Sequence, residues 1–431
     1  MLDQLWSAWL FPAPFLLLFW YRYFRHHKEF ENKDLDLEIH SPFIIFQITT
    51  KGGSPIVARV IERVREVCSQ IGYANYRVDV LTDDPRDFYD ANMIRTPHGF
   101  ESPHKSRFKS RALHYAVLWR RARGDNTADK WIFHLDEESF PTTQTIISVL
   151  KHITGSNPTP ISEGPIVYSN GIFDGSFLTR FSEAVRPFIC YDCVHQMSGS
   201  RIPLHMHGSN LLVRSDIEDR IGWDFGTVAS EDQRFGQEAH LNLISAAEGL
   251  RFGPEARSKF GISVFGWHGG LLHEQPPLTV KSWVRQRQRW FIGNVFNLQH
   301  SKIPRSVKAR IVARLITWMA GFPAGLISIA ALFFPQDFPL LLRALLGVVT
   351  VGWVASFQVG MRMNLRPTAL SNKQKRVFHL ELLVLTPLVG LIETYSAVTA
   401  PLKIRNWQWI PTEKQNEATI LAQATNRVHV A

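Results

Sequence analysis

Four long apolar segments constrain this 431-residue chain more than any other feature. About 20 consecutive apolar residues span the hydrocarbon core of a bilayer, and each of the four segments is long enough to do so. Residues 40 to 300 have instead the mixed charge of a water-soluble domain. We therefore expect a soluble domain with membrane-embedded ends, the apolar segments being Leu5–Phe24, Ile311–Phe334, Phe338–Met361 and Phe378–Leu402.

The basic residues beside these segments predict the side of the membrane on which the soluble domain lies. Positive charges at residues 22–28 follow the first segment rather than precede it, which indicates an uncleaved anchor and not a secretory signal. Because basic residues concentrate on the cytosolic side, these charges and the basic loop at 362–376 predict a cytosolic soluble domain. The membrane would be the plasma membrane in a bacterium and the ER or Golgi in a eukaryote.

The last apolar segment conflicts with a simple crossing. A single crossing by Phe378–Leu402 would place the C-terminus outside, yet Lys403, Arg405 and Lys414 follow it and favour the inside. Irregular backbone within a membrane is tolerated only where protein buries it. We expect a re-entrant or interfacial arrangement broken at Pro387, followed by a cytosolic tail.

The net charge of +10 raises the alternative of nucleic-acid binding. The basic residues cluster beside the apolar segments, where they meet anionic lipid headgroups, and no zinc-finger or RNA-binding motif is present. We expect membrane lipid as a partner and no nucleic acid. Cys190 and Cys193 lack the second pair that a zinc site requires, and three cysteines give no disulfide framework, which suits the cytosol. Nothing in the sequence indicates the oligomeric state.

Strand and helix patterns alternate between residues 40 and 170. Short apolar runs predict buried strands, and apolar residues at a 3.6-residue period predict a helix from Pro55 to Gly72. This order is typical of a parallel, doubly wound α/β sheet. The expected strands are Phe43–Thr49, Tyr76–Leu81, Trp131–Leu135 and Ile166–Tyr168, and the further helices are Ser110–Arg121 and Thr142–His152.

Beyond residue 170 the alternation weakens. Leu204–Val213 predicts one or two short strands around a turn at Gly208, and Thr279–Asn297 predicts an amphipathic helix suited to a membrane interface. The expected division of the chain is an anchor at 1–28, a soluble domain at 40–278, an interfacial region at 279–304, membrane helices at 305–404 and a tail at 405–431.

Carboxylates stand where two of the predicted strands end, which is the ligand-binding edge of open α/β sheets. Asp83 and Asp84 follow one strand, and Asp136-Glu137-Glu138 follows another. Oxygen ligands of this kind suit Mg²⁺ or Mn²⁺, and Asp136 and Glu138 would point to the same side if the strand continued through them. The alternative is a polar strand end without a ligand.

Two later motifs also offer chemistry. Asp232, after Ser230 and Glu231, could deprotonate a hydroxyl as a general base, or the three residues could simply form an acidic, capped helix start. The run from Gln286 to Trp290 offers guanidinium groups for phosphate and a flat ring for a sugar. Its alternative, a basic amphipathic helix against lipid headgroups, is compatible with that role.

Taken in order, these motifs resemble those of the family 2 inverting glycosyltransferases, the group that includes cellulose, chitin and hyaluronan synthases. Asp136-Glu137-Glu138 is similar to the Asp-x-Asp triplet of that family, with Glu138 in place of the second Asp. Ser230-Glu231-Asp232 is similar to its Thr-Glu-Asp triplet, with Ser230 in place of Thr. Gln286 to Trp290 is similar to its Gln-x-x-Arg-Trp motif.

This resemblance implies a GT-A-type α/β domain and a role for each matched residue. Asp232 would be the catalytic base, and Asp136 and Glu138 would hold Mg²⁺ or Mn²⁺. The residues that would bind the nucleotide sugar are Thr50, Lys51, Asp83, Asp84, Lys109, Asp136, Glu137, Gln286 and Arg289. The residues that would bind the acceptor are Gly208, Ser209, Asn210, Glu231 and Trp290.

Three shorter stretches resemble the Egghead-type β-1,4-mannosyltransferases in particular: Thr50 to Gly52, His134 to Glu138 and Glu274 to Pro277. That subgroup implies inverting transfer of mannose from GDP-mannose to a β-glucosyl lipid. One alternative is a processive polysaccharide synthase, for which three clear spans and one doubtful one are few. The other is a non-catalytic membrane scaffold, against which the presence of Asp136, Asp232 and Arg289 argues.

Overall fold

The computed structural model describes residues 12–30, 42–156, 158–198, 202–249, 264–333 and 340–405. Within these ranges the chain forms two compact units, each described here by itself. The sheet unit consists of residues 29–166 and 193–275, and the helical unit of residues 12–28, 167–192 and 276–405. The sequence places all of 40–278 in one domain, whereas residues 167–192 within that range belong to the helical unit.

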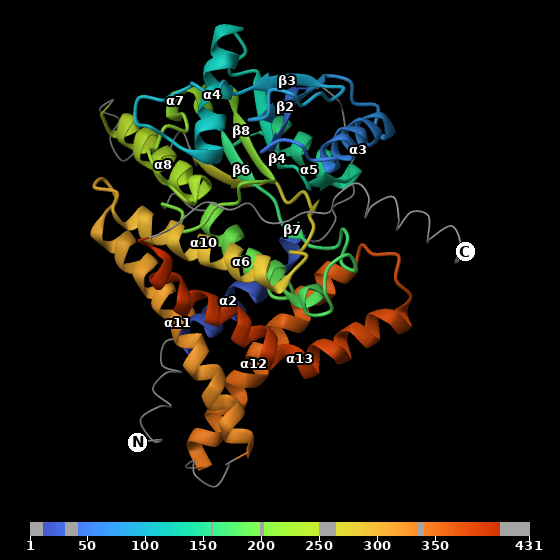
Figure 1. Ribbon diagram of the computed structural model, residues 1–431, viewed down its shortest axis with the longest axis vertical. Coiled ribbons are helices and arrows are strands. Elements are labelled where there is room, and N and C mark those ends of the chain that lie inside the picture. The colour runs from blue at the N-terminus through green and yellow to red at the C-terminus, as the bar shows by residue number, and fades with distance from the viewer. Residues whose placement is uncertain are drawn as a thin grey trace. The chain divides into compact units, whose positions relative to one another are not determined.

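A seven-stranded sheet in the order β3-β2-β1-β4-β8-β6-β9 forms the centre of the sheet unit. Figure 1 draws α3 and α5 on one side of this sheet and α4, α7 and α8 on the other. The doubly wound α/β class expected from the sequence is confirmed. The strands are β1 (Phe43–Thr50), β2 (Tyr76–Thr82), β3 (Asn92–Arg95), β4 (Lys130–Asp136), β6 (Ile161–Glu163), β8 (Leu211–Arg214) and β9 (Phe265–Trp267). The helices are α3 (Ile56–Gln70), α4 (Phe108–Ala122), α5 (Thr143–Thr154), α7 (Ser215–Ile221) and α8 (Glu231–Gly249).

The first half of the sheet follows the sequence patterns closely. The apolar run of β1 is buried on both faces, as expected for a central parallel strand. Helix α3 buries its apolar stripe and stops before Gly72, whose positive φ of 68° is typical of a residue that ends a helix. Thr142 caps α5 by accepting a hydrogen bond from the Thr145 amide, which explains where that predicted helix begins.

Parallel pairing brings the carboxyl ends of three strands into line. In the register of β1, Thr50 lies opposite Thr82 of β2, and Thr49 lies opposite Asp136 of β4. Residues that follow these positions therefore share one edge of the sheet, although they are far apart in the sequence. This edge is where ligands bind in open α/β sheets.

The second half of the sheet differs from the prediction. The strand expected at Ile166–Tyr168 is only β7 (Ile166–Val167), and it joins a separate three-stranded sheet with β5 (Phe140–Pro141) and β10 (Leu272–His273). The strand beside β4 is instead β8, which runs antiparallel to both β4 and β6. Leu204–Val213 contributes this single strand, preceded by irregular backbone. Strands of three or four residues carry too little periodicity to be found by pattern.

Among its described residues, the helical unit contains three helices that are long and apolar enough to cross a membrane: α11 (Arg305–Phe333), α12 (Leu340–Leu365) and α13 (Asn372–Thr399). Figure 1 draws α11 and α12 extending together and α13 running across them. On α13, Leu380, Val384 and Leu388 form an exposed apolar stripe at four-residue spacing. The remaining elements are α2 (Pro12–His26), η2 (His27–Phe30), η3 (Leu178–Phe181), α6 (Arg186–Met197), α10 (Val280–Leu298) and η5 (Ala400–Lys403), of which η2 and the end of α6 extend into the sheet unit.

One expectation about the membrane segments is wrong, and another falls partly outside the described residues. Helix α13 continues through Pro387, so the predicted break at that residue is wrong. The first apolar segment is described only from residue 12 onward, as α2, and its first residues lie outside the described range. Arg22, which follows that segment, makes an ion pair with Asp192, to which Arg314 of α11 is also paired at 3.3 Å. Arg22 is therefore paired within the protein, although it shares the Asp192 carboxylate with Arg314.

A buried charge network joins α13 to α10 inside the helical unit. Glu393 of α13 accepts hydrogen bonds from Arg287 Nε at 2.7 Å, Trp283 Nε1 at 3.1 Å and Arg186 Nη2 at 3.1 Å. Arg287 also pairs with Glu183 at 2.7 Å. An ionisable residue in an apolar helix is costly unless it is paired, so this network determines how α13 packs against α10.

We predict that Glu393→Gln destabilises the helical unit because it leaves two buried guanidinium groups without a full counter-charge. Removing one partner of a buried ion pair typically costs about 3–5 kcal/mol. Thermal unfolding in detergent should show a clear fall in the unfolding temperature. Glu381→Gln is the matched control, since Glu381 lies on the same helix and makes no ion pair with any residue that the structure describes. Equal shifts for the two variants would contradict the assigned role of the network.

Candidate active site

The loop after β1 is tied to the loops after β2 and β4. Thr50 Oγ1 donates to Glu137 Oε2 at 2.6 Å and accepts from the Gly52 amide at 3.1 Å, while the Gly53 amide donates to Asp87 Oδ1 at 2.9 Å. Gly52 has a φ of 114°, and a Cβ there would lie only 2.4 Å from Cβ of Asp84. This glycine is therefore required for the close approach of the two loops.

The aspartates after β2 have different partners. Asp83 accepts from Arg111 Nη2 at 2.9 Å. Arg86 hydrogen-bonds to Asp84 and lowers the pKa of that carboxyl to about 2. Asp87, which the sequence analysis did not single out, accepts from Thr82 Oγ1 at 2.6 Å as well as from the Gly53 amide. Asp87 thus organises the loop after β2, whereas Asp83 and Asp84 have arginine partners. Lys51, in the loop after β1, is exposed.

Strand β4 ends at Asp136, so the condition under which strand alternation would point Asp136 and Glu138 to the same side is not met. Glu137 and Glu138 form a turn, closed by a hydrogen bond from the Ser139 amide to the Asp136 carbonyl at 3.1 Å. Glu137 and Glu138 therefore follow Asp136 in a turn rather than along the strand. The side chain of Asp136 is 34% exposed and pairs with Lys109 Nζ at 2.5 Å. Three carboxylates within one turn form an oxygen-rich donor set of the kind that Mg²⁺ and Mn²⁺ prefer.

The segment from His207 to Asn210 forms a rigid loop on the other side of Lys109. Asn210 is buried in the left-handed conformation, with a φ of 54°, and its Nδ2 donates to the carbonyls of Pro165 and Gly270 at 2.8 Å each. The His207 amide donates to the buried Glu163 at 2.7 Å. A non-glycine residue in this conformation persists only where the surroundings hold it.

Gly208 brings the two halves of the site together. A Cβ at this position would lie 3.2 Å from Lys109 Nζ and 3.3 Å from Asp232 Oδ2. The Lys109 ammonium group therefore lies close to Asp136 and Gly208, and Gly208 in turn lies close to Asp232. Lys109, Asp136 and Gly208 are widely separated in the sequence. Burial alone would lower the pKa of Lys109, but the negative charges of Asp136, Glu231 and Asp232 raise it above its ordinary value.

Asp232 lies in the first turn of α8, next to Glu231. Burial and the charge of Glu231 raise the pKa of Asp232 to about 7, although the Gln233 amide, Lys109 and His207 act in the opposite direction. A carboxylate with a pKa near neutrality is suited to take and release a proton under physiological conditions. Asp232 is thus a buried carboxyl with a raised pKa rather than a helix cap on the surface.

Helix α10, in the helical unit, carries Gln286, Arg289 and Trp290. Asp136 and Asp232 belong to the sheet unit. The spacing of the three α10 residues places them on one side of the helix. Gln286 Oε1 accepts from Arg287 Nη1 at 2.7 Å, and the Trp290 ring is contacted by the guanidinium groups of Arg186 and Arg287, at 4.2 and 4.3 Å from the ring centre. Helix α10 buries Trp283 and Arg287, so only part of its surface remains for lipid or substrate.

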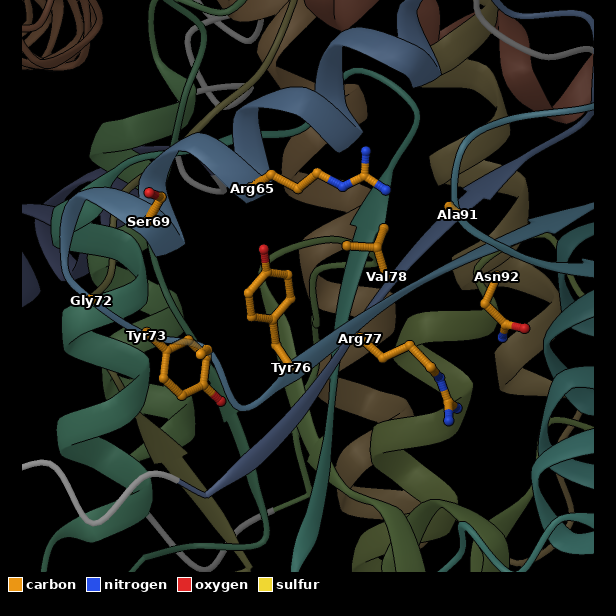
Figure 2. A pocket seen from close by; sticks show the side chains of 10 residues that line it. Arg65, Ser69, Gly72, Tyr73, Tyr76, Arg77, Val78, Ala91 and Asn92 are labelled. Atoms are coloured by element: carbon orange, nitrogen blue, oxygen red, sulfur yellow. The ribbon is translucent and has the colours of Figure 1, made fainter.

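A hollow of about 700 Å³ lies at the amino ends of β2 and β3, where Tyr76 and Asn92 begin these strands (Figure 2). Its two arginines already have carboxylate partners, Arg65 with Asp90 and Arg77 with Asp79. The amino ends of parallel strands lie at the edge opposite to their carboxyl ends. This hollow is therefore separate from the cluster around Lys109.

Besides Asp87, the sequence analysis missed roles for Ser139, Glu163 and Glu274. Ser139 and Ser209 both donate a hydrogen bond to Glu274 Oε1, the first at 3.1 Å. Glu274 was noted only as part of a subgroup resemblance. Ser139 could have been noticed because it directly follows the acidic triplet. Glu163 lies in β6, a strand of three residues that is too short to show a sequence pattern.

Burial of the Asp232 carboxylate predicts a pH-dependent stability effect. A carboxyl whose pKa is raised in the folded state, here to about 7, stabilises the fold at low pH, and that stabilisation is lost as the pH rises toward 7. Asp232→Asn should therefore raise the unfolding temperature at pH 8, by at least about 2 °C, and by much less at pH 5. Asp90→Asn, which removes an exposed carboxylate, is the control. A gain for Asp232→Asn that is equal at both pH values would contradict the assigned environment.

Comparison with known proteins relates this site to a family. The model of the glycosyl transferase family group 2 matches residues 131–363, more than half of the chain. A solved structure that resembles the chain is the mannosyltransferase PcManGT from Pyrobaculum calidifontis in complex with GDP-Man and Mn²⁺, at 14% identity and a TM-score of 0.49, with 94% of this chain and 99% of that chain covered.

Curated relatives include the β-1,4-mannosyltransferases bre-3 of Caenorhabditis briggsae and Caenorhabditis elegans, each 24% identical over 294 residues, and egh of Drosophila melanogaster, 24% identical over 291 residues. The matches cover 64–65% of this chain but only 58% of each relative's length. Because the family model covers more than half of the chain, including the acidic turn, Asp232 and the Gln286–Trp290 motif, the chain belongs to the glycosyl transferase family group 2.

Proposed function

We propose that this protein transfers mannose from GDP-mannose to a hydroxyl of a β-glucosyl lipid, with inversion, on the cytosolic side of a membrane. Family membership supports glycosyl transfer, and the names of the relatives from Caenorhabditis and Drosophila support mannose and the β-1,4 linkage. The observation that carries the proposal is that Lys109 pairs with Asp136 and lies, with Asp232, beside Gly208, which supports a donor-side cation and a base in one site.

In this mechanism Asp232 removes the proton from the acceptor hydroxyl. The attacking oxygen then forms a bond to the anomeric carbon on the face opposite to the leaving diphosphate, which inverts the configuration. A pKa near 7 allows Asp232 to accept the proton at neutral pH, and a positioned base of this kind typically contributes about 10²–10⁴ in rate. The Glu231 charge helps to keep that pKa high.

On the donor side, Lys109 supplies positive charge where the diphosphate leaves. Asp136 and Glu138 would hold Mg²⁺ or Mn²⁺, which when bound supplies further positive charge to the leaving group. Thr50 and Glu137 order the loop beside them, and Asp83 and Asp84 would contact the nucleoside. The motif resemblance would assign Gln286 and Arg289 to the diphosphate and Trp290 to the acceptor. The Gly208–Asn210 loop would border the acceptor hydroxyl.

A membrane-bound acceptor is supported by the three long apolar helices and by the exposed apolar stripe of α13. Cytosolic placement of the sheet unit is supported by the basic loop at 362–376 and by Arg25 and Lys28. Arg22 contributes less to this argument because it is paired with Asp192.

We predict that the purified protein with Mn²⁺ or Mg²⁺ adds a single mannose from GDP-mannose to octyl β-glucoside. UDP-glucose, UDP-N-acetylglucosamine and GDP-glucose serve as alternative donors, and octyl α-glucoside is the matched acceptor control. Mass spectrometry of the products gives both the sugar and the number added. A ladder of long products would favour the processive synthase. If the protein neither transfers a sugar nor hydrolyses any of the donors, the result would favour the scaffold.

We further predict that kcat/KM of the wild-type protein rises with pH and levels off above a pH of about 7, as Asp232 loses its proton. Asp232→Asn should lower kcat by about 10²–10⁴ while the Kd for GDP changes by less than about twofold, because the base does not contact the nucleotide. Initial rates and isothermal titration calorimetry measure the two quantities. Near-normal turnover by the variant would exclude Asp232 as the base.

A further inference from the structure

We propose that Glu274 is a positioning residue that joins the donor-side loop, Asp136 to Ser139, to the acceptor-side loop, His207 to Asn210. It would hold the two loops at a fixed separation, so that donor and acceptor meet in one geometry. The assignment of the loops to donor and acceptor rests on the proposed function, whereas the connection between them rests on the hydrogen bonds alone.

A short chain of hydrogen bonds makes the connection. Ser139 Oγ accepts from the Asp136 amide at 3.0 Å and donates to Glu274 Oε1 at 3.1 Å. Ser209 Oγ donates to the same carboxylate oxygen. One atom of Glu274 therefore receives both serine hydroxyls, one from each loop.

Burial makes this arrangement specific. Glu274 is only 7% exposed, and Ser139 and Ser209 are buried as well. A carboxylate removed from water is unfavourable unless hydrogen bonds replace its hydration, and bonds to an ionised acceptor are stronger than those to a neutral one. Movement of either loop away from Glu274 would remove such a bond inside the protein.

The backbone places Glu274 for this task. Strands β10 and β5 pair antiparallel, with Leu272 opposite Pro141 and His273 opposite Phe140. Continuing this register by one residue brings Glu274 to Ser139. The acceptor-side loop reaches the same point because Asn210 is held by the carbonyls of Pro165 and Gly270.

The separation that Glu274 controls is the one that matters for the proposed transfer. The Asp136 carboxylate pairs with Lys109, and Gly208 lies between Lys109 and Asp232. Displacement of one loop relative to the other would alter the distance between the leaving group and the base. Transfer rates are sensitive to such shifts, since reacting atoms must lie within about 3–3.5 Å of each other.

The test compares Glu274→Gln and Glu274→Ala with Ser139→Ala and Ser209→Ala, and uses Glu66→Gln, on the exposed side of α3, as the control. Amide hydrogen exchange of the ligand-free protein is the first measurement. Glu274→Ala should speed amide exchange in both 136–139 and 207–210 by at least about tenfold. Glu274→Gln should speed exchange less, and Glu66→Gln should leave both segments unchanged. Acceleration confined to one loop, or to neither, would overturn the connection.

The second measurement separates the two sides of the site. Ser139→Ala should raise the Kd for GDP with Mn²⁺ by about tenfold, and Ser209→Ala should raise the KM for octyl β-glucoside by about tenfold. A tenfold change is the effect expected when about one hydrogen bond to a charged group is lost. Glu274→Ala should raise both constants, and Glu274→Gln should recover part of each. A Glu274→Ala variant that changes only one constant would contradict the proposal. If Glu274→Ala does not fold, the Ser139→Ala/Ser209→Ala pair replaces it.

These measurements distinguish the two proposals. If the wild-type protein transfers no mannose but Glu274→Ala loosens both loops, the proposed function fails and the positioning role stands. If mannose is transferred and Glu274→Ala leaves the exchange of both loops unchanged, the positioning role fails and the function stands.

Discussion

The ammonium group of Lys109, enclosed by carboxylates, is the interaction on which the site depends. Asp136 pairs with it directly, and Glu231 and Asp232 add enough negative charge to overcome the cost of its burial. These acids come from a strand end and from the start of a helix, so the cation balances charges that would otherwise repel one another. Without Lys109, the edge of the sheet would carry an excess of buried negative charge.

The same balance explains how Asp232 differs from Asp84. Both are acidic residues beside a buried sheet edge, but Asp84 has an arginine partner and a pKa of about 2, whereas Asp232 is desolvated beside Glu231 and has a pKa of about 7. Environment therefore keeps one carboxylate charged near neutral pH and allows the other to change its protonation there, which suits the proton transfer proposed for it. A buried network also governs the helical unit, where Glu393 and Arg287 tie an apolar helix to the Gln286–Trp290 motif.

Local patterns accounted for β1, β2, β4 and the helices α3, α4, α5 and α10, because each contains enough residues to show its own periodicity. They also located the candidate site residues, since polar groups at strand ends stand out against apolar runs. Patterns failed for β6, which has three residues, and for Pro387, where a continuous helix replaced the expected break; they located β8 only within Leu204–Val213 and did not give its antiparallel position. Tertiary packing can hold a helix through a proline when neighbouring elements support it.

The sequence by itself determined that the chain has a doubly wound α/β part, long apolar segments at both ends and an ordered series of acidic and basic motifs matching one family. These features depend on neighbouring residues, which share a strand or a helix face. Only the tertiary structure decided that β8 runs antiparallel beside β4, that Gly208 lies between Lys109 and Asp232, and that one oxygen of Glu274 receives two serines. Such contacts join residues more than 20 positions apart, and their partners are chosen by burial and hydrogen bonding in the folded chain rather than by any local pattern.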